Sequence, residues 1–177
     1  MLLSNQQKYI LDALRKLGCV REDQLHALVR GKFQRPGFAV REEHMTTMLR
    51  QLRSGLGDFH VDGGFVYLAR GQPDAARLEA IDVMLELSEG ALQEFIVKVD
   101  SPRLLCFTLG GDKLKLFSVA MLSHVSDTQL LQRERSERIV WISDSGTPPD
   151  GLALPPKHFF AARQTDGSHR FYGSNGP

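Results

Sequence analysis

The chain has few cysteines and lacks the common catalytic and metal-binding motifs. Its two cysteines, Cys19 and Cys106, have no CxxC partner and no nearby cluster of histidines. This pattern favours buried, reduced thiols over a metal site or a catalytic thiol. The motifs GxxxxGK[ST], GxGxxG, HExxH and GxSxG are also absent. The sequence therefore predicts a protein without a metal site or a cofactor.

Long hydrophobic runs are missing as well. No stretch approaches the roughly 18 apolar residues that a membrane-spanning helix needs. The first residues, Met1–Lys8, do not show the charged-then-apolar order of a signal peptide. We therefore expect a cytoplasmic protein with no membrane partner.

Charge is nearly balanced overall but unevenly distributed along the chain. The 177 residues carry a net charge of +1, and this length suits one large domain or two small ones. Residues 1–70 hold 11 Lys and Arg against 7 Asp and Glu, a net charge of +4, whereas residues 71–177 hold 11 against 14, a net charge of −3. The positive field thus belongs to the first part of the chain, and we expect two domains, 1–70 and 71–177.

The first part shows the order of a winged helix-turn-helix. Apolar residues at helical spacing predict a helix capped by Asn5 and ending near Leu17, a second helix over Val20–Val29 and a third over Val40–Ser54. A basic loop, Arg30–Gly37, separates the second and third helices because its Pro and Gly interrupt a continuous helix.

Two short β-prone runs follow the third helix. They are Asp58–Val61 and Phe65–Leu68, and the residues Asp62-Gly63-Gly64 between them are typical of a tight hairpin. Helices followed by a hairpin are a specific order, and this order predicts a wing.

Candidate DNA contacts lie on the third helix and around it. Opposite its apolar stripe the helix carries Thr46, Thr47 and Arg50, with Arg53 at the edge, and these residue types contact phosphates and base edges. Glu43 shares this face and is less favourable near phosphate. Outside the helix we expect phosphate contacts from Arg30, Lys32, Arg35 and His60. An ordinary solvated face, or a face that docks a protein, remains an alternative.

The second part has the pattern of a small α+β domain with a C-terminal hairpin. Gly71-Gln72-Pro73 marks the joint and Asp74 can cap the next helix. The expected elements are a helix over Ala75–Leu87, strands over Glu94–Val99, Leu104–Leu109 and Leu114–Met121, a helix from Ser126 or Asp127 to Glu137, a strand over Ile139–Ile142 that is buried on both faces, and a hairpin over Lys157–Arg163 and His169–Tyr172.

A helix, three strands, a helix and a strand are also the core order of restriction-endonuclease-like domains. Metal-dependent members need an acidic residue and an acidic-x-Lys set on adjacent strands, because the carboxylates hold Mg²⁺. Neither Asp112–Lys115 nor Glu94–Lys98 has that spacing. We therefore expect a domain that is not an enzyme, with the charged run Arg133–Arg138 forming a solvated helix end. A nuclease whose carboxylates come from distant segments is the alternative.

The whole layout resembles the replication-relaxation family of proteins carried on plasmids and conjugative elements. The resemblance covers most of residues 5–143 and rests on Gln6–Leu11, on the wing Phe59–Leu68 and on Ile139–Ile142. It implies a winged-helix DNA-binding head joined to an endonuclease-like fold without an active site. It also implies a role in the replication or transfer of a mobile element.

The sequence and this resemblance therefore favour a non-enzymatic protein that binds double-stranded DNA, an accessory factor in the replication, transfer or transcription of a mobile genetic element. The third helix would enter the major groove, and the second domain would form a homodimer or recruit a replication or transfer protein. The alternative function is an adaptor whose winged helix docks a partner protein.

Overall fold

The chain folds into two compact units of mixed α+β structure. The computed structural model describes residues 2–69, 71–97, 100–131 and 136–173. The units are Met1–Leu78 and Glu79–Pro177. The boundary between them along the chain therefore falls within a helix, whereas the sequence analysis placed it after residue 70. One sheet has three strands and the other has six. Within the described part of the chain, no helix is both long and apolar enough to cross a membrane.

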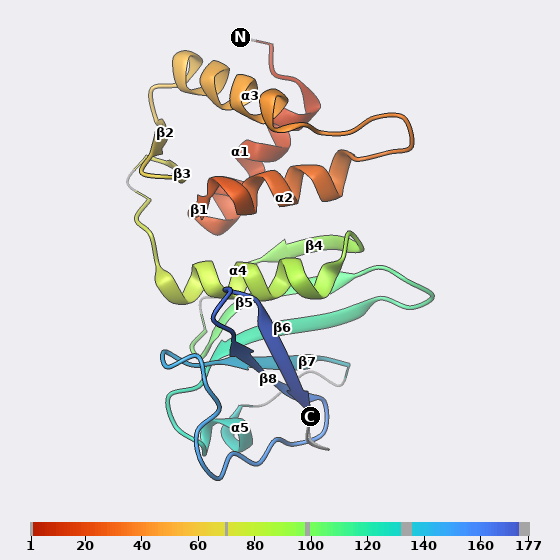
Figure 1. Cartoon of the computed structure of the whole chain (residues 1–177), viewed down its shortest axis with the longest axis vertical. Helices are drawn as coiled ribbons and strands as arrows, with labels where there is room; N and C mark the ends of the chain where they lie inside the picture. Colours follow the sequence, from red (N-terminus) through yellow and green to blue (C-terminus); the bar gives the residue numbers. More distant parts are fainter. Residues whose placement is uncertain (1, 70, 98–99, 132–135, 174–177) are drawn as a thin grey trace. The chain divides into compact units, whose positions relative to one another are not determined.

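Unit 1 contains three helices and a small antiparallel sheet (Figure 1). The helices are α1 (Asn5–Leu17), α2 (Glu22–Phe33) and α3 (Glu42–Gly55), and the strands are β1 (Cys19–Arg21), β2 (Phe59–Asp62) and β3 (Phe65–Leu68). The sheet order is β1-β3-β2. Its core is built by the apolar faces of the three helices and by β3, through Ile10, Leu14, Leu17, Leu25, Leu28, Leu52 and Val66, each at most 2% exposed.

The first helix is capped one residue earlier than the sequence predicted. Ser4, not Asn5, is the N-cap: its hydroxyl accepts from the backbone N–H of Gln7 at 3.2 Å. The side-chain oxygen of Gln7 in turn accepts from the backbone N–H of Ser4 at 2.9 Å. This reciprocal pair is a capping box, which satisfies two N–H groups that the helix itself leaves unpaired.

The expected second helix was wrong at both ends. Cys19–Arg21 form β1, because Cys19 pairs with Tyr67 and Arg21 with Phe65. The helix then continues through Gly31 to Phe33, so Arg30 and Lys32 lie in its last turn and not in a loop. Cations there are favourable because the carboxyl end of a helix carries partial negative charge. The third helix begins at Glu42, two residues later than predicted.

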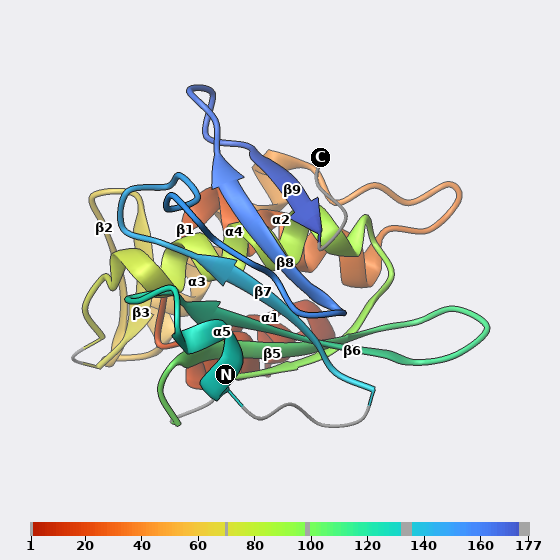
Figure 2. The same cartoon turned by 90° about the horizontal axis from the view of Figure 1, so that it is seen from below.

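Unit 2 is organised around a six-stranded mixed sheet (Figure 2). Neighbouring strands in this sheet are consecutive in the sequence. They are β4 (Leu92–Ile96), β5 (Arg103–Leu109), β6 (Lys115–Met121), β7 (Arg138–Ile142), β8 (His158–Arg163) and β9 (His169–Gly173). Strands β6, β7 and β8 are parallel, and the other neighbours are antiparallel. Helix α4 (Ala75–Ser88) contains the boundary between the units, and Asp74 accepts from the backbone N–H of Arg77 at its start, as expected for a cap.

The strand predicted to be buried on both faces is confirmed. Every residue of Ile139–Ile142 is at most 1% exposed, and the strand lies between β6 and β8. On one face Ile139 and Trp141 pack with Ala120, Leu122, Phe160 and Ala162, under Leu131, Leu152 and Leu154. The long connection from β7 to β8 therefore covers this face of the sheet.

The predicted helix from residue 126 to Glu137 was wrong in length. Helix α5 covers only Asp127–Leu130. Residues 132–135, which hold most of the charged run, lie outside the described residues. Glu137 is not on a solvated helix end, because its side chain is 2% exposed and forms an ion pair with Arg103. The ion pair with Arg103 stabilises the buried carboxylate. The local sequence around Glu137 does not reveal this distant partner.

Candidate nucleic-acid interface

Helix α3 separates a buried stripe from a polar face. Met45, Leu49 and Leu52 are at most 6% exposed and belong to the core of unit 1. The four predicted contact residues of the helix, Thr46, Thr47, Arg50 and Arg53, are all exposed. The helical period therefore places them away from the core, where a large partner can reach them.

The exposed side chains of α3 differ in which hydrogen-bonding and charged groups remain available to a ligand. The Thr46 hydroxyl donates to the carbonyl of Glu42 at 3.1 Å, and the Thr47 hydroxyl donates to that of Glu43 at 2.9 Å. Both hydroxyls can still accept a hydrogen bond, but their protons are used. Within the described residues, Arg50 and Arg53 have no ion-pair partner. Their guanidinium groups are therefore available to a ligand on this face.

The amino end of α3 is acidic. Glu42 and Glu43 occupy its first turn, and both are exposed. Carboxylates there are favourable for the helix because its amino end carries partial positive charge. The same carboxylates repel phosphate. A polyanion is thus expected to approach the half of α3 that carries Arg50 and Arg53.

The hairpin of β2 and β3 lies next in the chain and is tightly closed. Gly63 and Gly64 form its turn with φ of 56° and 82°, values that glycine adopts at little cost. His60 and Tyr67 are paired across the two strands, and their rings stack at 5.2 Å between centroids. His60 is half-buried by this contact.

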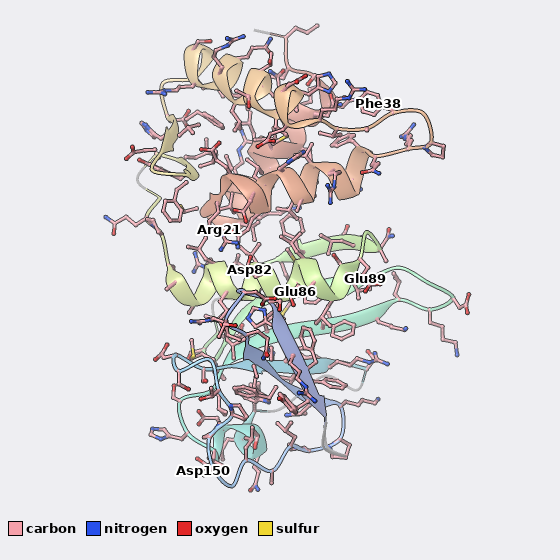
Figure 3. The ribbon with its side chains drawn as sticks, viewed as in Figure 1. Arg21, Phe38, Asp82, Glu86, Glu89 and Asp150 are labelled. Atoms are coloured by element: carbon pink, nitrogen blue, oxygen red, sulfur yellow. The ribbon has the colours of Figure 1, made fainter. Side chains whose placement is uncertain are left out.

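The remaining predicted residues lie on other elements. Arg30 and Lys32 are exposed on the last turn of α2, and Arg35 is exposed in the loop that follows. This loop is closed by a bridge between Arg35 and Phe38, and Phe38 projects from it at 45% exposure (Figure 3). The structure therefore brings Thr46, Thr47, Arg50 and Arg53 onto one helix face and leaves these three cations on a separate segment.

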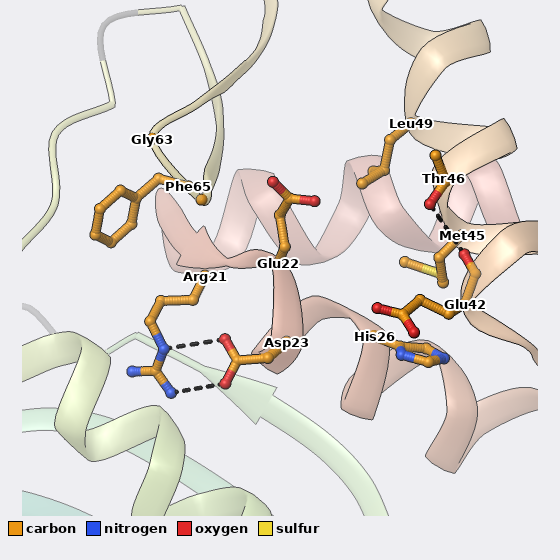
Figure 4. Close-up of a pocket in the computed structure, with 11 residues that line it drawn as sticks. Arg21, Glu22, Asp23, His26, Glu42, Met45, Thr46, Leu49, Gly63 and Phe65 are labelled. Carbon is orange, nitrogen blue, oxygen red and sulfur yellow. Dashed lines mark hydrogen bonds and ion pairs between the residues drawn. The ribbon is translucent and has the colours of Figure 1, made fainter. Parts of the chain in front are cut away.

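A groove of about 510 Å³ runs beside α3 (Figure 4). Its floor includes Met45, Leu49 and Phe65, and its rim carries carboxylates from the first turns of α2 and α3, Glu22, Asp23 and Glu42. Sequence reasoning missed this groove, because the acidic residues come from segments 20 residues apart.

One carboxylate of the groove is neutralised by a neighbour. The Arg21 guanidinium donates to both oxygens of Asp23, at 3.0 and 3.1 Å. Partial burial alone would raise the pKa of Asp23, but the hydrogen bonds and the charge of Arg21 outweigh it and lower the pKa. Among the described residues, no ion pair neutralises Glu22 or Glu42, so the groove keeps negative charge.

Unit 2 contains two polar clusters that the sequence did not predict. In the first, Arg103 donates to both oxygens of Glu137 at 2.9 Å, Ser118 donates to Glu137, and Cys106 lies 2.9 Å from the Ser118 hydroxyl. These four groups satisfy one another in the interior of the sheet. Their arrangement is that of a structural network, because Arg103 occupies the carboxylate that a catalytic base would need free.

The second cluster joins α4 to the C-terminal hairpin. Arg163 forms an ion pair with Glu79, and the His169 ring faces Glu86 at 2.9 Å and Glu79 at 3.4 Å. The backbone N–H of His169 also donates to Glu86 at 3.0 Å. Nevertheless, the described residues contain no group of three or more His, Cys, Asp or Glu that could hold a metal ion.

Comparisons with protein-family models, with curated proteins and with solved structures found no match for this chain.

Proposed function

We propose that unit 1 is a winged helix-turn-helix that binds double-stranded DNA through α3. The observation that carries the proposal is the exposed face of this helix, where Thr46, Thr47, Arg50 and Arg53 all point away from the core. The hairpin that follows supplies the wing. Such a helix fits the major groove, where side chains reach base edges and phosphates.

The charges favour an approach through the carboxyl half of the helix. Arg50 and Arg53 would contact phosphates, and the wing near His60 would lie against the adjacent backbone. Arg30, Lys32 and Arg35 would add phosphate contacts from the end of α2 and its loop. The net charge of +4 in residues 1–70 supports this polarity.

We also propose that unit 2 is an endonuclease-like core without an active site. Helix α4, strands β4 to β6, the short α5 and β7 follow one another in the order of that core, with β7 parallel to β6. The unit would form a homodimer or recruit a replication or transfer protein, as the resemblance to the replication-relaxation family implies. In this proposal the protein is an accessory factor of a mobile element and not an enzyme.

The test removes both unpaired arginines of α3. Arg50→Ala with Arg53→Ala is expected to weaken duplex binding and to reduce the slope of log affinity against log salt by about 2, because each lost phosphate contact removes about one unit. A matched control, Lys113→Ala with Lys115→Ala, removes two exposed charges from unit 2 and should bind like the wild type. Equal affinities for all three proteins would overturn the assignment of α3.

The acidic groove favours a second candidate function. An adaptor that docks a partner protein would use the apolar floor and charged rim beside α3, where carboxylates oppose DNA. This function predicts no salt-dependent affinity for DNA. The same titration separates the two candidates, since only the DNA-binding proposal requires the affinity to fall steeply with salt.

A further inference from the structure

Gln51 is an exposed residue of α3 whose side-chain amide accepts a hydrogen bond from α1. It follows Arg50 directly, and its side-chain oxygen accepts from the side-chain NH₂ of Gln7 at 2.9 Å. Gln7 comes from the first turn of α1 and is 5% exposed. A buried amide thus fixes an exposed one across 44 residues of sequence.

The orientation of both amides follows from the capping box. The backbone N–H of Ser4 donates to Gln7 at 2.9 Å, and only the oxygen of the Gln7 amide can accept this hydrogen. The NH₂ group of Gln7 must therefore face Gln51. Because an NH₂ group donates, Gln51 must present its oxygen to Gln7. The start of α1 consequently determines which way the Gln51 amide points.

The held amide keeps unused hydrogen-bonding capacity. Its oxygen has a second lone pair, and its NH₂ has two N–H groups; within the described residues none of these has another partner. An acceptor and a donor therefore stand side by side at the edge of the polar face of α3, next to α1. By contrast, Thr46 and Thr47 donate their hydroxyl protons to backbone carbonyls.

An acceptor beside a donor matches one base in the major groove. Adenine offers the N6 amino group as donor next to N7 as acceptor, and a glutamine amide can bond both at once. Holding the amide in place before binding reduces the conformational entropy lost on contact. The Gln7–Gln51 hydrogen bond therefore favours a base-reading role over a role in general affinity.

We propose that Gln51 reads an adenine in the DNA site and that Gln7 is its positioning residue. This inference rests on the proposed function, because it requires α3 to enter the major groove. It assigns different tasks to neighbouring residues. Arg50 and Arg53 supply affinity, whereas Gln51 supplies preference for one base at one position.

The test compares base preferences selected from a pool of randomised duplexes. The wild type should select a site with an adenine at one or more fixed positions. Gln51→Ala should lose the preference at one such position, with discrimination there falling about tenfold or more, while the salt slope stays unchanged. Gln51→Glu keeps an oxygen for Gln7 and should shift the preference at that position to cytosine, whose N4 group donates.

A second pair of variants tests the positioning role. Gln7→Glu keeps the capping box, since Glu accepts from Ser4 equally well, but it cannot donate to Gln51. The Gln51 amide should then turn to donate, and the adenine preference should fall without loss of the fold. Gln6→Glu makes the same charge change one residue away and should leave the preference intact.

The outcomes distinguish the inference from the function on which it rests. Salt-dependent binding with an identical base profile for wild type and Gln51→Ala would overturn the inference alone. An unchanged adenine preference in Gln7→Glu would overturn the positioning role. A wild type that binds no duplex at low salt would overturn both the inference and the proposed function.

Discussion

Glu137 is a buried carboxylate of unit 2 whose charge is balanced by Arg103. It stands in a run of alternating charges, which is typical of a solvated helix, yet its side chain is 2% exposed. Its partner Arg103 lies 34 residues away on β5. No local pattern marks such a pair, because the sheet that brings the two residues together is built from distant segments. The cluster could not have been predicted from sequence.

Removing this carboxylate should strongly destabilise unit 2. Glu137→Ala would remove the carboxylate that accepts two hydrogen bonds from the guanidinium of Arg103, and breaking a buried ion pair costs roughly 3–5 kcal/mol. Urea unfolding followed by the fluorescence of Trp141, the single tryptophan and fully buried in this unit, would measure the loss. The exposed Glu94 is the control, since Glu94→Ala should change the free energy of unfolding by less than about 0.5 kcal/mol. Similar values for both variants would contradict the burial of the ion pair.

Ionisation of the buried Tyr9 phenol should make unit 1 less stable at alkaline pH. Burial, with a smaller contribution from the charge of Asp12, raises its pKa to about 12. A phenol with a raised pKa stabilises the fold fully below about pH 10, where it ionises in the unfolded chain, and this contribution is lost as pH rises toward the folded value. The loss should reach about 2 kcal/mol at pH 11.5.

The measurement is urea unfolding followed by circular dichroism at pH 9 and pH 11.5. The wild type should lose more stability between the two values than Tyr9→Phe, which has no phenol to ionise. An equal loss in both proteins would show that other groups cause the alkaline dependence.

At the scale of the element, periodic patterns predicted the structure best. The helices α1, α3 and α4 and the strand β3 lie within two residues of the positions that the sequence indicated, because each buries one face or one stripe. Strand β7 was recognised from its continuous apolar run, which is buried on both faces. Strand β1 was missed because Cys19–Arg21 are too few to show alternation, and their pairing with β3 decides their conformation. For the candidate site, the exposed face of α3 was predictable from helical period, whereas the Gln7–Gln51 bond and the acidic groove depend on how helices meet.

The capping box of α1 is a testable detail at this scale. Ser4→Ala removes the oxygen that accepts from Gln7 and should cost unit 1 about 1 kcal/mol of stability. Asn5→Ala changes the residue that the sequence suggested as the cap and should be nearly neutral, because the hydroxyl of Ser4 already fills that role. Thermal unfolding followed by circular dichroism would rank the two variants. A larger effect of Asn5→Ala would contradict the assigned cap.

At the scale of the whole molecule, the sequence predicted the mixed α+β class but not the six-stranded sheet. The parallel neighbours β6, β7 and β8 are joined through long connections, and nothing in the strands themselves indicates which of them lie side by side. The uneven distribution of charge along the chain is also a property of the whole molecule, and it can be read directly from the sequence. A net charge of +4 in residues 1–70 against −3 in residues 71–177 supports the proposal that DNA contact belongs to unit 1.

The most direct test of DNA binding is a fluorescence anisotropy titration of the full chain against random duplex DNA at two salt concentrations. The account predicts binding at low salt that weakens steeply as salt rises, because the arginines of α3 would release counterions from the phosphates. Absence of binding at low salt, or an affinity that does not change with salt, would contradict DNA binding by unit 1.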